Sequence, residues 1–481
     1  MEYMNGKELA TLAGGKILCG NSEITISSVT TNSKEVTEGT LFVPIIGEKV
    51  DGHRFIGQAV QSGATAIFTA REDVVGDCQA DHNPVVILVD NTLQALQKVA
   101  AGYHKRLASP VVGITGSVGK TTTKEMIAAA LHTKHILKTA GNMNSQVGLP
   151  LMLLRLQEEH ELAVLEMGMS EPGEMARLAV MATPETMVVT NIGVAHIAQL
   201  KTRENIRKEK LNSINQMRAG GTLILNGDDV LLCALKDAPE QVELADETRD
   251  ALHQANILTY GLQENCDFYA ENIRILEGGY TAFLAHGVQN GEPFTVPVML
   301  HVLGSHNVGN ALAALAVASC YGIAPEDAAK GLAEYRPLAM RGQILNRNGV
   351  TWIDDTYNAS PDSMRSGSQV LLSIPAGRHI AVLADVLELG EESQRLHREV
   401  GEFLADLSVE SRSLDCLVTV GEQAKYIAAG IQKNEHICVK ECQNNTEAAT
   451  FLKDYLKEQD AVFVKGSRGM HTEEILAAFM E

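Results

Sequence analysis

The segment that most limits what this chain can fold into runs from residue 111 to residue 123. Its sequence, VVGITGSVGKTTT, predicts an apolar strand, a glycine-rich turn and the start of a helix. In such a turn, backbone N–H groups, a lysine and a hydroxyl bind phosphate oxygens and an accompanying Mg²⁺. The generic phosphate-binding pattern has glycine five residues before the Gly-Lys pair. Here that position is Ile114 and Gly113 lies one residue earlier, so the segment predicts a nucleotide site of variant spacing.

The residues of this turn have predicted roles in binding ATP. Lys120 is expected to bridge the β- and γ-phosphates, and Thr121 is expected to bind Mg²⁺. The other predicted ATP contacts in the turn are Gly116, Ser117, Val118, Gly119 and Thr122. The alternative is a structural glycine-rich turn with a chance Gly-Lys-Thr, which would need no nucleotide.

The charge balance excludes some partners. The 481 residues include 40 Lys+Arg and 60 Asp+Glu, which gives a formal net charge of −20. Nucleic acid and an anionic membrane surface both repel such a chain, so we expect neither as a partner. A small anionic substrate is compatible with this charge where local cations and backbone N–H groups outweigh the mean field.

The cysteines and the apolar segments predict a cytoplasmic protein. No two of the eight cysteines have the C-x-x-C spacing of a zinc or redox site, which favours free thiols in a reducing compartment. The first residues lack a basic segment followed by an apolar one, and the apolar stretch 311–324 is too short to cross a bilayer. We therefore expect no signal peptide and no membrane insertion, with 311–324 forming a buried helix.

Length and element order predict three α/β domains. Residues 1–107 form a small module, residues 108–336 a central P-loop domain with a parallel sheet, and residues 337–481 a smaller doubly wound, Rossmann-like domain. Apolar runs mark the expected strands, which are 40–46, 85–89, 111–115, 135–138, 162–166, 187–191, 222–226, 351–353, 379–384, 416–420 and 461–464, with a helix over 93–107.

Polar side chains follow two of the central strands. Glu166 ends the strand 162–166, and Asn191 and His196 follow the next one. The carboxyl ends of parallel strands meet at one edge of a sheet, where ligands bind. Glu166 is a suitable Mg²⁺ ligand because hard cations prefer carboxylate oxygen. Taken alone, His196 is as compatible with a structural role, and the charged segment 203–210 with a solvated helix face.

Further segments, taken in order, resemble the motif series of the Mur ligase family. They are GITGSVGKTTTKE (113–125), GNMNSQVGLP (141–150), LEMGMSEPGEM (165–175), NIGVAHI (191–197), GSHNVGNALAA (304–314), DDTYNASPDSM (354–364), LELGEESQRLH (387–397) and KGSRGMHTEEI (465–475). Residues 30–56 also resemble that family's UDP-binding module, so the resemblance extends over essentially the whole chain.

The order and spacing of these motifs resemble those of the family members that add D-alanyl-D-alanine to UDP-N-acetylmuramoyl-tripeptide. The resemblance implies an ATP-dependent amide ligase that works through an acyl phosphate and forms the pentapeptide precursor of peptidoglycan, ADP and phosphate. It implies the tripeptide nucleotide and the dipeptide as small-molecule partners, and we expect a monomer.

The resemblance also implies two Mg²⁺ sites and a carbamylated lysine. Carbamylation turns a cation that would repel Mg²⁺ into an oxygen ligand. By position the lysine is Lys210, with Lys208 as the alternative. The implied metal ligands are Thr121, Glu166, His196 and Lys210, and the implied catalytic residues are Lys120, His196, Lys210 and Arg341.

The remaining site residues are carried over from the same motifs. Asn307, Asn310, Arg341 and Asp355 are expected at ATP, with Arg341 reaching the γ-phosphate when the third domain closes about Pro337. The expected UDP-substrate residues are Ser33, Gly47, Asp51, Gly52, His53, Asn142 and Asn144, and the expected dipeptide residues are Tyr357, Asn358, Asp385, Glu388, Lys465 and Arg468. The alternative for the third-domain residues is interdomain ion pairing.

Two other functions are compatible with parts of the sequence. A diamino-acid-adding Mur ligase typically carries an Asp-Asn-Pro-Arg motif, which this chain lacks. A P-loop ATPase that drives a partner protein would hydrolyse ATP without an amine acceptor. Phosphate release that depends on both ligase substrates would separate the ligase from this ATPase.

Overall fold

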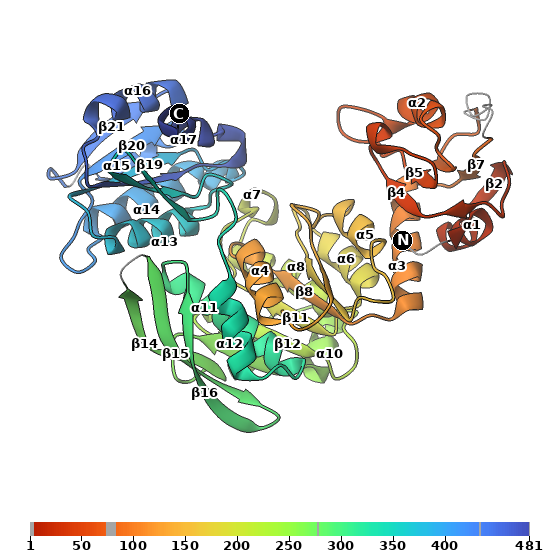
Figure 1. Ribbon diagram of the computed structural model, residues 1–481, viewed down its shortest axis with the longest axis horizontal. Helices are drawn as coiled ribbons and strands as arrows, with labels where there is room; N and C mark the ends of the chain where they lie inside the picture. The colour runs from red at the N-terminus through yellow and green to blue at the C-terminus, as the bar shows by residue number, and fades with distance from the viewer. Residues whose placement is uncertain (1–3, 74–82, 277–278, 432–433, 481) are drawn as a thin grey trace.

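Three β-sheets of five or more strands, each with its own helices, organise the chain (Figure 1). A further two-stranded sheet pairs Met4–Asn5 with Thr25–Ile26. The computed structural model describes residues 4–73, 83–276, 279–431 and 434–480. The N-terminal sheet lies at one end, the largest sheet lies in the middle, and the C-terminal sheet lies over the far side of the middle domain (Figure 1). The predicted α/β class with three sheet-based domains is confirmed.

The middle sheet has nine described strands in the order β16-β15-β14-β13-β12-β11-β8-β10-β9. From β9 to β14 neighbouring strands are parallel, and β15 pairs antiparallel with both β14 and β16. The bounds are β8 Val111–Thr115, β9 Ile136–Lys138, β10 Leu162–Glu166, β11 Thr186–Val189, β12 Thr222–Asn226, β13 Asn256–Gly261, β14 Phe268–Leu276, β15 Tyr280–Gln289 and β16 Glu292–Leu300.

Helices cover both faces of this sheet, as parallel strands require. They are α4 Lys120–Ala130, α5 Gly148–Leu153, α6 Glu174–Ala182, α7 Ile197–Leu200, α8 Arg203–Leu211, α9 Val230–Asp237, α10 Asp246–Gln254, α11 Ser305–Cys320 and α12 Pro325–Glu334. The predicted buried helix 311–324 overlaps α11, in which every residue from Ala311 to Ala318 is buried, but α11 ends at Cys320, so residues 321–324 lie beyond the helix. All five residues of β8 are buried as well, which explains its unbroken apolar sequence.

The N-terminal sheet has the strand order β2-β7-β6-β5-β4. Its strands are parallel except for the antiparallel edge pair β2–β7. The elements here are β1 Met4–Asn5, α1 Gly6–Ala13, β2 Lys16–Cys19, β3 Thr25–Ile26, β4 Ser28–Thr30, β5 Thr40–Phe42, α2 Ile56–Gln61, β6 Ala66–Thr69, β7 Val85–Leu88 and α3 Thr92–Leu107. Helix α3 connects to the middle domain, where the Tyr103 hydroxyl donates to the Leu156 carbonyl at 2.6 Å.

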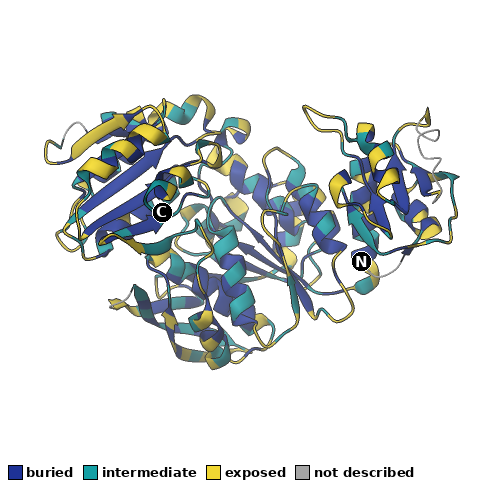
Figure 2. Ribbon diagram, turned by 45° about the horizontal axis from the view of Figure 1, so that its top comes forward, coloured by how far each residue is buried: buried dark blue, intermediate teal, exposed yellow. Residues whose placement is uncertain are grey.

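The C-terminal sheet has the strand order β17-β18-β22-β19-β20-β21 and is parallel except for the edge pair β17–β18. Its strands are β17 Gln343–Arg347, β18 Val350–Asp354, β19 Arg378–Ala384, β20 Cys416–Val420, β21 Cys438–Cys442 and β22 Asp460–Lys465. Its helices are α13 Pro361–Ser373, α14 Ser393–Asp406, α15 Lys425–Ile431, α16 Asn445–Tyr455 and α17 Glu473–Met480. Figure 2 shows buried strands inside each of the three domains and exposed residues on the outer helix faces.

The expected strands correspond to observed strands, with small shifts at their ends. Residues 40–46 contain only the short strand β5, and the chain leaves the sheet after Phe42. The strands β1 to β4, β6, β13 to β17 and β21 lie outside the expected set. No helix in the described residues is both long enough and apolar enough to cross a membrane.

Candidate active site

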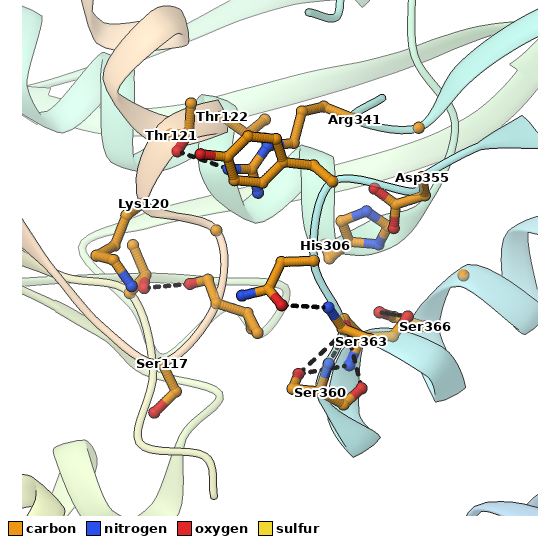
Figure 3. Close-up of a pocket in the computed structure, with 18 of the residues that line it drawn as sticks. Ser117, Lys120, Thr121, Thr122, His306, Arg341, Asp355, Ser360, Ser363 and Ser366 are labelled. Atoms are coloured by element: carbon orange, nitrogen blue, oxygen red, sulfur yellow. Dashed lines mark hydrogen bonds between the residues drawn. The ribbon is translucent and has the colours of Figure 1, made fainter. Parts of the chain in front are cut away.

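One cavity of about 640 Å³ lies between the glycine-rich turn of the middle domain and the C-terminal domain. Figure 3 shows Lys120 and Thr121 on one side of it and Ser360 and Ser363 of the C-terminal domain on the other. Most of the predicted site residues line it, namely Ser117, Val118, Gly119, Lys120, Thr121, Thr122, Asn142, Asn144, Glu166, His196, Asn307, Asn310, Arg341, Asp355, Tyr357, Asn358, Glu388, Lys465 and Arg468.

Two glycines shape the turn between β8 and α4. Gly116 has φ +148°, and a Cβ there would lie 1.8 Å from Thr190 Oγ1. Gly119 has φ +86° and is the residue before the first residue of α4. Residues with a Cβ atom rarely adopt these two backbone conformations, so the turn depends on these glycines. The backbone N–H groups of the first turn of α4 point into the cavity with the positive end of the helix dipole.

The turn is held by contacts with the next strand of the sheet. The Ser117 and Val118 N–H groups donate to Asn191 Oδ1 at 3.0 and 2.9 Å, and Lys120 Nζ donates to the Gly116 carbonyl at 2.8 Å. Burial lowers the pKa of Lys120 and the Arg341 guanidinium adds to this effect, while the Glu166 carboxylate opposes it. A phosphate bound at Lys120 would therefore also lie near the charges of Arg341 and Glu166.

Glu166 is buried at the end of β10, with its two carboxylate oxygens in different surroundings. Oε2 accepts from Thr121 Oγ1 and from Asn144 Nδ2, both at 3.3 Å. Oε1 lies 3.3 Å from Lys124 Nζ but accepts no hydrogen bond from the described residues. A hydroxyl and an incompletely satisfied carboxylate are oxygen donors of the kind that Mg²⁺ prefers, so Thr121 and Glu166 fit a magnesium site.

His196 and the two candidate lysines have different environments. His196 lines the cavity, and its Nδ1 lies 3.4 Å from Glu388 Oε2 of the C-terminal domain. Lys208 Nζ pairs with Glu243 Oε1 at 2.8 Å near the surface. Lys210 is buried on α8 and does not line the cavity, and burial together with the charge on Lys120 lowers its pKa well below the ordinary value.

The segment 203–210 is therefore only partly a solvated helix face. Arg207, Glu209 and Lys210 of α8 are buried, and Glu209 Oε1 accepts from the Met175 N–H at 2.9 Å. Burial of charged side chains on one face of a helix requires partners from the packed neighbours. This packing anchors α8 to α6.

The asparagines on α11 form a hydrogen-bonded chain that reaches α4. Thr123 Oγ1 donates to Asn310 Oδ1 at 3.0 Å, Asn310 Nδ2 donates to Asn307 Oδ1 at 3.2 Å, and Asn307 Nδ2 donates to the Leu303 carbonyl at 2.7 Å. Both asparagines line the cavity while holding α11 against the helix that follows the glycine-rich turn.

The C-terminal domain contributes two cationic groups on β22 and on the segment before β17. Lys465 Nζ pairs with Asp355 Oδ2 and also donates to the Asp355 carbonyl at 3.3 Å. Sequence motifs had placed these two residues at different ligands, whereas the structure joins them. Arg341 Nη2 donates to Thr121 Oγ1 at 3.4 Å, and its guanidinium lies 3.8 Å from the Tyr357 ring centroid. Arg341 thus bridges the two sides of the cavity.

Among the predicted dipeptide residues, Asp385 does not line the cavity. Its carboxylate is buried and accepts from the backbone N–H groups of Glu422, Gln423 and Ala424 at 3.2, 2.9 and 2.7 Å. Its backbone carbonyl accepts from the Ser467 N–H at 3.1 Å. Asp385 therefore connects three loops of the C-terminal domain and leaves no oxygen directed at a ligand.

Arg468 and Asn358 lie at the cavity edge. Arg468 Nη1 pairs with Glu473 Oε1 at 2.9 Å, and the Arg468 N–H donates to Asn358 Oδ1 at 3.3 Å. The Arg468 side chain is half exposed and already has an acidic partner. A ligand carboxylate would have to compete with Glu473 for it.

The predicted UDP-substrate residues fall into two groups. Asn142 and Asn144 line the central cavity, whereas Ser33, Gly47, Asp51, Gly52 and His53 lie in the N-terminal domain and do not line it. His53 Nδ1 lies 2.7 Å from Asp51 Oδ1, and His53 Nε2 accepts from the Ala70 N–H at 3.0 Å. The His53 N–H and side chain lower the pKa of Asp51, and Arg71 adds to this. Ser33 Oγ donates to Gln58 Oε1 at 3.0 Å.

A second cluster of ligand-type side chains lies on the surface, at His135, Glu159 and His160. The imidazoles of His135 and His160 are stacked with ring centroids 4.8 Å apart. His160 Nδ1 accepts from the Gln157 N–H at 3.0 Å, so in the neutral ring the proton is on Nε2. That tautomer leaves His160 no free lone pair for a metal, so within this cluster His135 and Glu159 would have to supply the ligand atoms.

Several cavity residues were not predicted from the sequence, although some lie inside the motifs. Asn191 was predicted at a strand end but was given no role. His306 is part of the GSHNVGN motif, in which only the two asparagines were assigned. Burial and Lys465 lower the pKa of His306, while Asp355 opposes them. Asp228, in the turn after β12, and Tyr260, in β13, also line the cavity, and their only sequence signal was a position after or within an apolar strand.

Comparisons with known proteins agree with the arrangement of the domains. The family model described as Mur ligase family, catalytic domain matches residues 25–104, that described as Mur ligase middle domain matches residues 114–318, and that described as Mur ligase, glutamate ligase domain matches residues 340–468. Each match covers most of one of the three larger sheets.

Individual relatives match over almost their whole length. The UDP-N-acetylmuramoyl-tripeptide–D-alanyl-D-alanine ligase of Bacillus subtilis is 37% identical over 480 residues, which are 99% of this chain and 98% of that protein. A crystal structure of MurF from Acinetobacter baumannii superimposes with a TM-score of 0.87 at 30% identity, covering 100% of this chain and 99% of that one. MurF ligase from Thermotoga maritima in complex with ADP gives a TM-score of 0.79 at 31% identity, covering 94% and 96%. The chain belongs to the Mur ligase family.

Proposed function

We propose that this chain is an ATP-dependent ligase that joins D-alanyl-D-alanine to UDP-N-acetylmuramoyl-tripeptide. The products are the pentapeptide precursor of peptidoglycan, ADP and phosphate. The observation that carries the proposal is the single cavity in which the glycine-rich turn and Lys120 face Arg341 and the Asp355–Lys465 pair. The names of full-length relatives specify the substrates, and the ADP bound by the Thermotoga maritima structure supports ATP as the nucleotide.

The chemistry needs an activated carboxylate, because amide formation from a free carboxylate in water is unfavourable. A carboxylate oxygen of the tripeptide attacks the γ-phosphorus of ATP, the bond to the β-phosphate oxygen breaks, and ADP leaves. The amine of the dipeptide then attacks the acyl phosphate carbonyl, phosphate leaves with the C–O bond electrons, and the amine loses a proton. Such transfers depend on positioning and charge neutralisation rather than on a protein nucleophile.

The described residues fit these steps. The backbone N–H groups at the start of α4 and Lys120 would hold the β- and γ-phosphates once Lys120 exchanges the Gly116 carbonyl for phosphate oxygen. The Ser117 and Val118 N–H groups would first have to leave Asn191 Oδ1. Arg341 approaches the same place from the C-terminal domain through Thr121. Asn307 and Asn310 would lie at the nucleoside, on the α11 side of the cavity.

Magnesium would be held by Thr121 and Glu166 at one site and by His196 and a carbamylated Lys210 at a second. When bound, the metal would neutralise phosphate charge. Lys210 is favoured over Lys208 because carbamylation requires a neutral amine, and the buried Lys210 has a strongly lowered pKa whereas Lys208 is paired with Glu243.

The proposed substrate residues combine the motif resemblance with the position of each residue in the structure. We assign Ser33, Gly47, Asp51, Gly52 and His53 to the uridine end of the tripeptide nucleotide, and Asn142 and Asn144 to the end that enters the cavity. For the dipeptide we retain Asn358, Lys465 and Arg468, which line the cavity, and assign Asp385 to loop support.

The domain limits 1–107, 108–336 and 337–481 remain part of the proposal, with a hinge about Pro337. Closure of the third domain would exclude water from the acyl phosphate. A monomer is sufficient for the reaction because one chain supplies both sides of the cavity.

The test measures phosphate release with ATP, Mg²⁺ and UDP-N-acetylmuramoyl-tripeptide, with and without D-alanyl-D-alanine, and follows the nucleotide-linked product by mass spectrometry. Release that needs both substrates, with a gain of the dipeptide mass less water, is expected. Release that is indifferent to both substrates would replace the ligase with a P-loop ATPase. Release that needs a diamino acid in place of the dipeptide would indicate the other Mur ligase reaction.

A further inference from the structure

Arg341 and Tyr357 make the closest contact between a cation and an aromatic ring in the described residues. The guanidinium carbon lies 3.8 Å from the ring centroid. A planar guanidinium stacks on an aromatic face because the face carries negative electrostatic potential and the cation is weakly hydrated. At this distance the ring face holds the position of the guanidinium.

The backbone reinforces the same pairing. The Tyr357 N–H donates to the Met340 carbonyl at 3.2 Å, directly before Arg341. Met340 has φ +64°, a left-handed conformation that turns the chain at this point. The loop after β18 and the segment before β17 are therefore joined twice, once by the backbone and once by the ring.

The Arg341 guanidinium remains open to an anionic ligand. In the described part of the chain it pairs with no carboxylate, and its polar contact is Thr121 Oγ1 at 3.4 Å. Arg468, by contrast, is paired with Glu473 and lies 6.0 Å from the same ring. A ring holds a cation without neutralising it, whereas an acidic partner would compete with phosphate.

The Tyr357 hydroxyl makes no hydrogen bond with the residues that the structure describes, so the contact that places Tyr357 is made by its ring. We infer that Tyr357 is a positioning residue that holds the Arg341 guanidinium at the γ-phosphate end of the cavity. This inference rests on the proposed ligase function and replaces the dipeptide-binding role that the motif had suggested for Tyr357.

The experiment compares Tyr357→Leu, which removes the ring face, with Tyr357→Phe, which removes only the hydroxyl. Calorimetry measures the affinities for ADP and for a non-hydrolysable ATP analogue, and steady-state kinetics gives kcat and the KM for D-alanyl-D-alanine. Tyr357→Leu should lower kcat about tenfold and weaken the ATP analogue more than ADP, with the dipeptide KM unchanged. Tyr357→Phe should keep most of the wild-type kcat.

Two variants of the partner complete the test. In an Arg341→Met background, Tyr357→Leu should cause little further loss, because two residues that act through one contact are not additive. Arg341→Lys keeps the charge but not the planar face, so it should lose about as much as Tyr357→Leu, and it remains informative if the Leu variant does not fold.

The inference is overturned if Tyr357→Phe loses as much as Tyr357→Leu, or if Tyr357→Leu raises the dipeptide KM while nucleotide affinities stay unchanged. Additive losses in the Arg341→Met background would overturn it as well. Phosphate release by the wild-type enzyme that does not depend on both substrates would instead contradict the proposed function. The two negative results can therefore be told apart.

Discussion

His196 Nδ1 lies 3.4 Å from Glu388 Oε2, and the two side chains belong to different domains. With the Nδ1 proton directed at Glu388, the lone pair of the neutral imidazole is on Nε2, which is then available to a metal. Glu388 would then orient a metal ligand and not bind the dipeptide.

We expect Glu388→Ala to lower turnover about tenfold at limiting Mg²⁺, the lower end of the usual range for an orienting partner because Glu388 is largely exposed. Phosphate release as a function of Mg²⁺ concentration measures this. Glu391→Ala, an exposed acidic residue nearby in sequence, is the control and should behave as wild type. A raised dipeptide KM with normal Mg²⁺ dependence would restore the dipeptide role of Glu388.

Lys210 should carry a carbamate that depends on CO₂ and on pH. The neutral amine attacks CO₂, an N–C bond forms and a proton leaves, so protonation of the lysine opposes the reaction. Burial and Lys120 lower the pKa of Lys210, which keeps the amine neutral at lower pH than an ordinary lysine allows. As pH falls through this lowered pKa, carbamate and turnover should decrease together.

Carbon NMR with ¹³C-bicarbonate measures the carbamate directly. Lys210→Met should abolish the signal and lower turnover at least about tenfold, given the loss of a ligand to a catalytic metal. Lys208→Met should retain the signal, because Lys208 pairs with Glu243. A signal that survives in Lys210→Met and disappears in Lys208→Met would reverse the assignment.

Lys124 should contribute strongly to stability. It is buried behind the glycine-rich turn, pairs with Glu125 at 2.9 Å and Glu166 at 3.3 Å, and donates to the Thr139 carbonyl at 2.8 Å. Removing one partner of a buried ion pair leaves an uncompensated charge and costs about 3–5 kcal/mol. Lys124→Met should lower the free energy of unfolding by an amount in this range, measured by urea denaturation.

The matched control for this variant is Lys138→Met. Lys138 also pairs with Glu125, but about half of its side chain is exposed, so its loss should cost less than about 1 kcal/mol. Equal losses for the two variants would show that burial of Lys124 does not decide its contribution.

The sequence predicted the parallel core of the fold better than its edges. Strands such as β8, β10 and β20 are buried along their whole length and therefore consist mainly of apolar residues. The antiparallel extension of the middle sheet alternates buried and partly exposed residues, and β16 contains Pro293 and Pro297. Proline in a strand argues against a central position and is tolerated in β16 because that strand is at the sheet edge.

The site was predictable where its residues are neighbours in sequence. The glycine-rich turn brings its predicted phosphate-binding groups together, so the position of Lys120 and Thr121 in one cavity could be predicted from spacing. Pairs such as Asp355–Lys465 and His196–Glu388 depend on which strands and domains meet, and no local pattern encodes this. The same limit explains Asp385, whose motif suggested a ligand contact although its carboxylate is used by the backbone of another loop.

Asp385 should act on stability more than on substrate affinity. Its carboxylate satisfies three backbone N–H groups before α15, and its own carbonyl accepts from Ser467 in the loop that carries Arg468. Hydrogen bonds to a charged group contribute about 1.5–3 kcal/mol. Asp385→Ala should therefore lower the free energy of unfolding by roughly 2–3 kcal/mol in a chemical denaturation experiment.

Asp385→Asn is the matched control because it keeps one accepting oxygen in the same place. It should lose less stability than Asp385→Ala, and both folded variants should show a dipeptide KM within about threefold of wild type. A large increase in KM for Asp385→Asn, without a change in stability, would mean that the carboxylate charge reaches the dipeptide after all. Val386, Leu387 and Glu388 line the cavity directly after Asp385, so the loop that carries them needs a rigid support. The three backbone hydrogen bonds that the Asp385 carboxylate accepts provide this support.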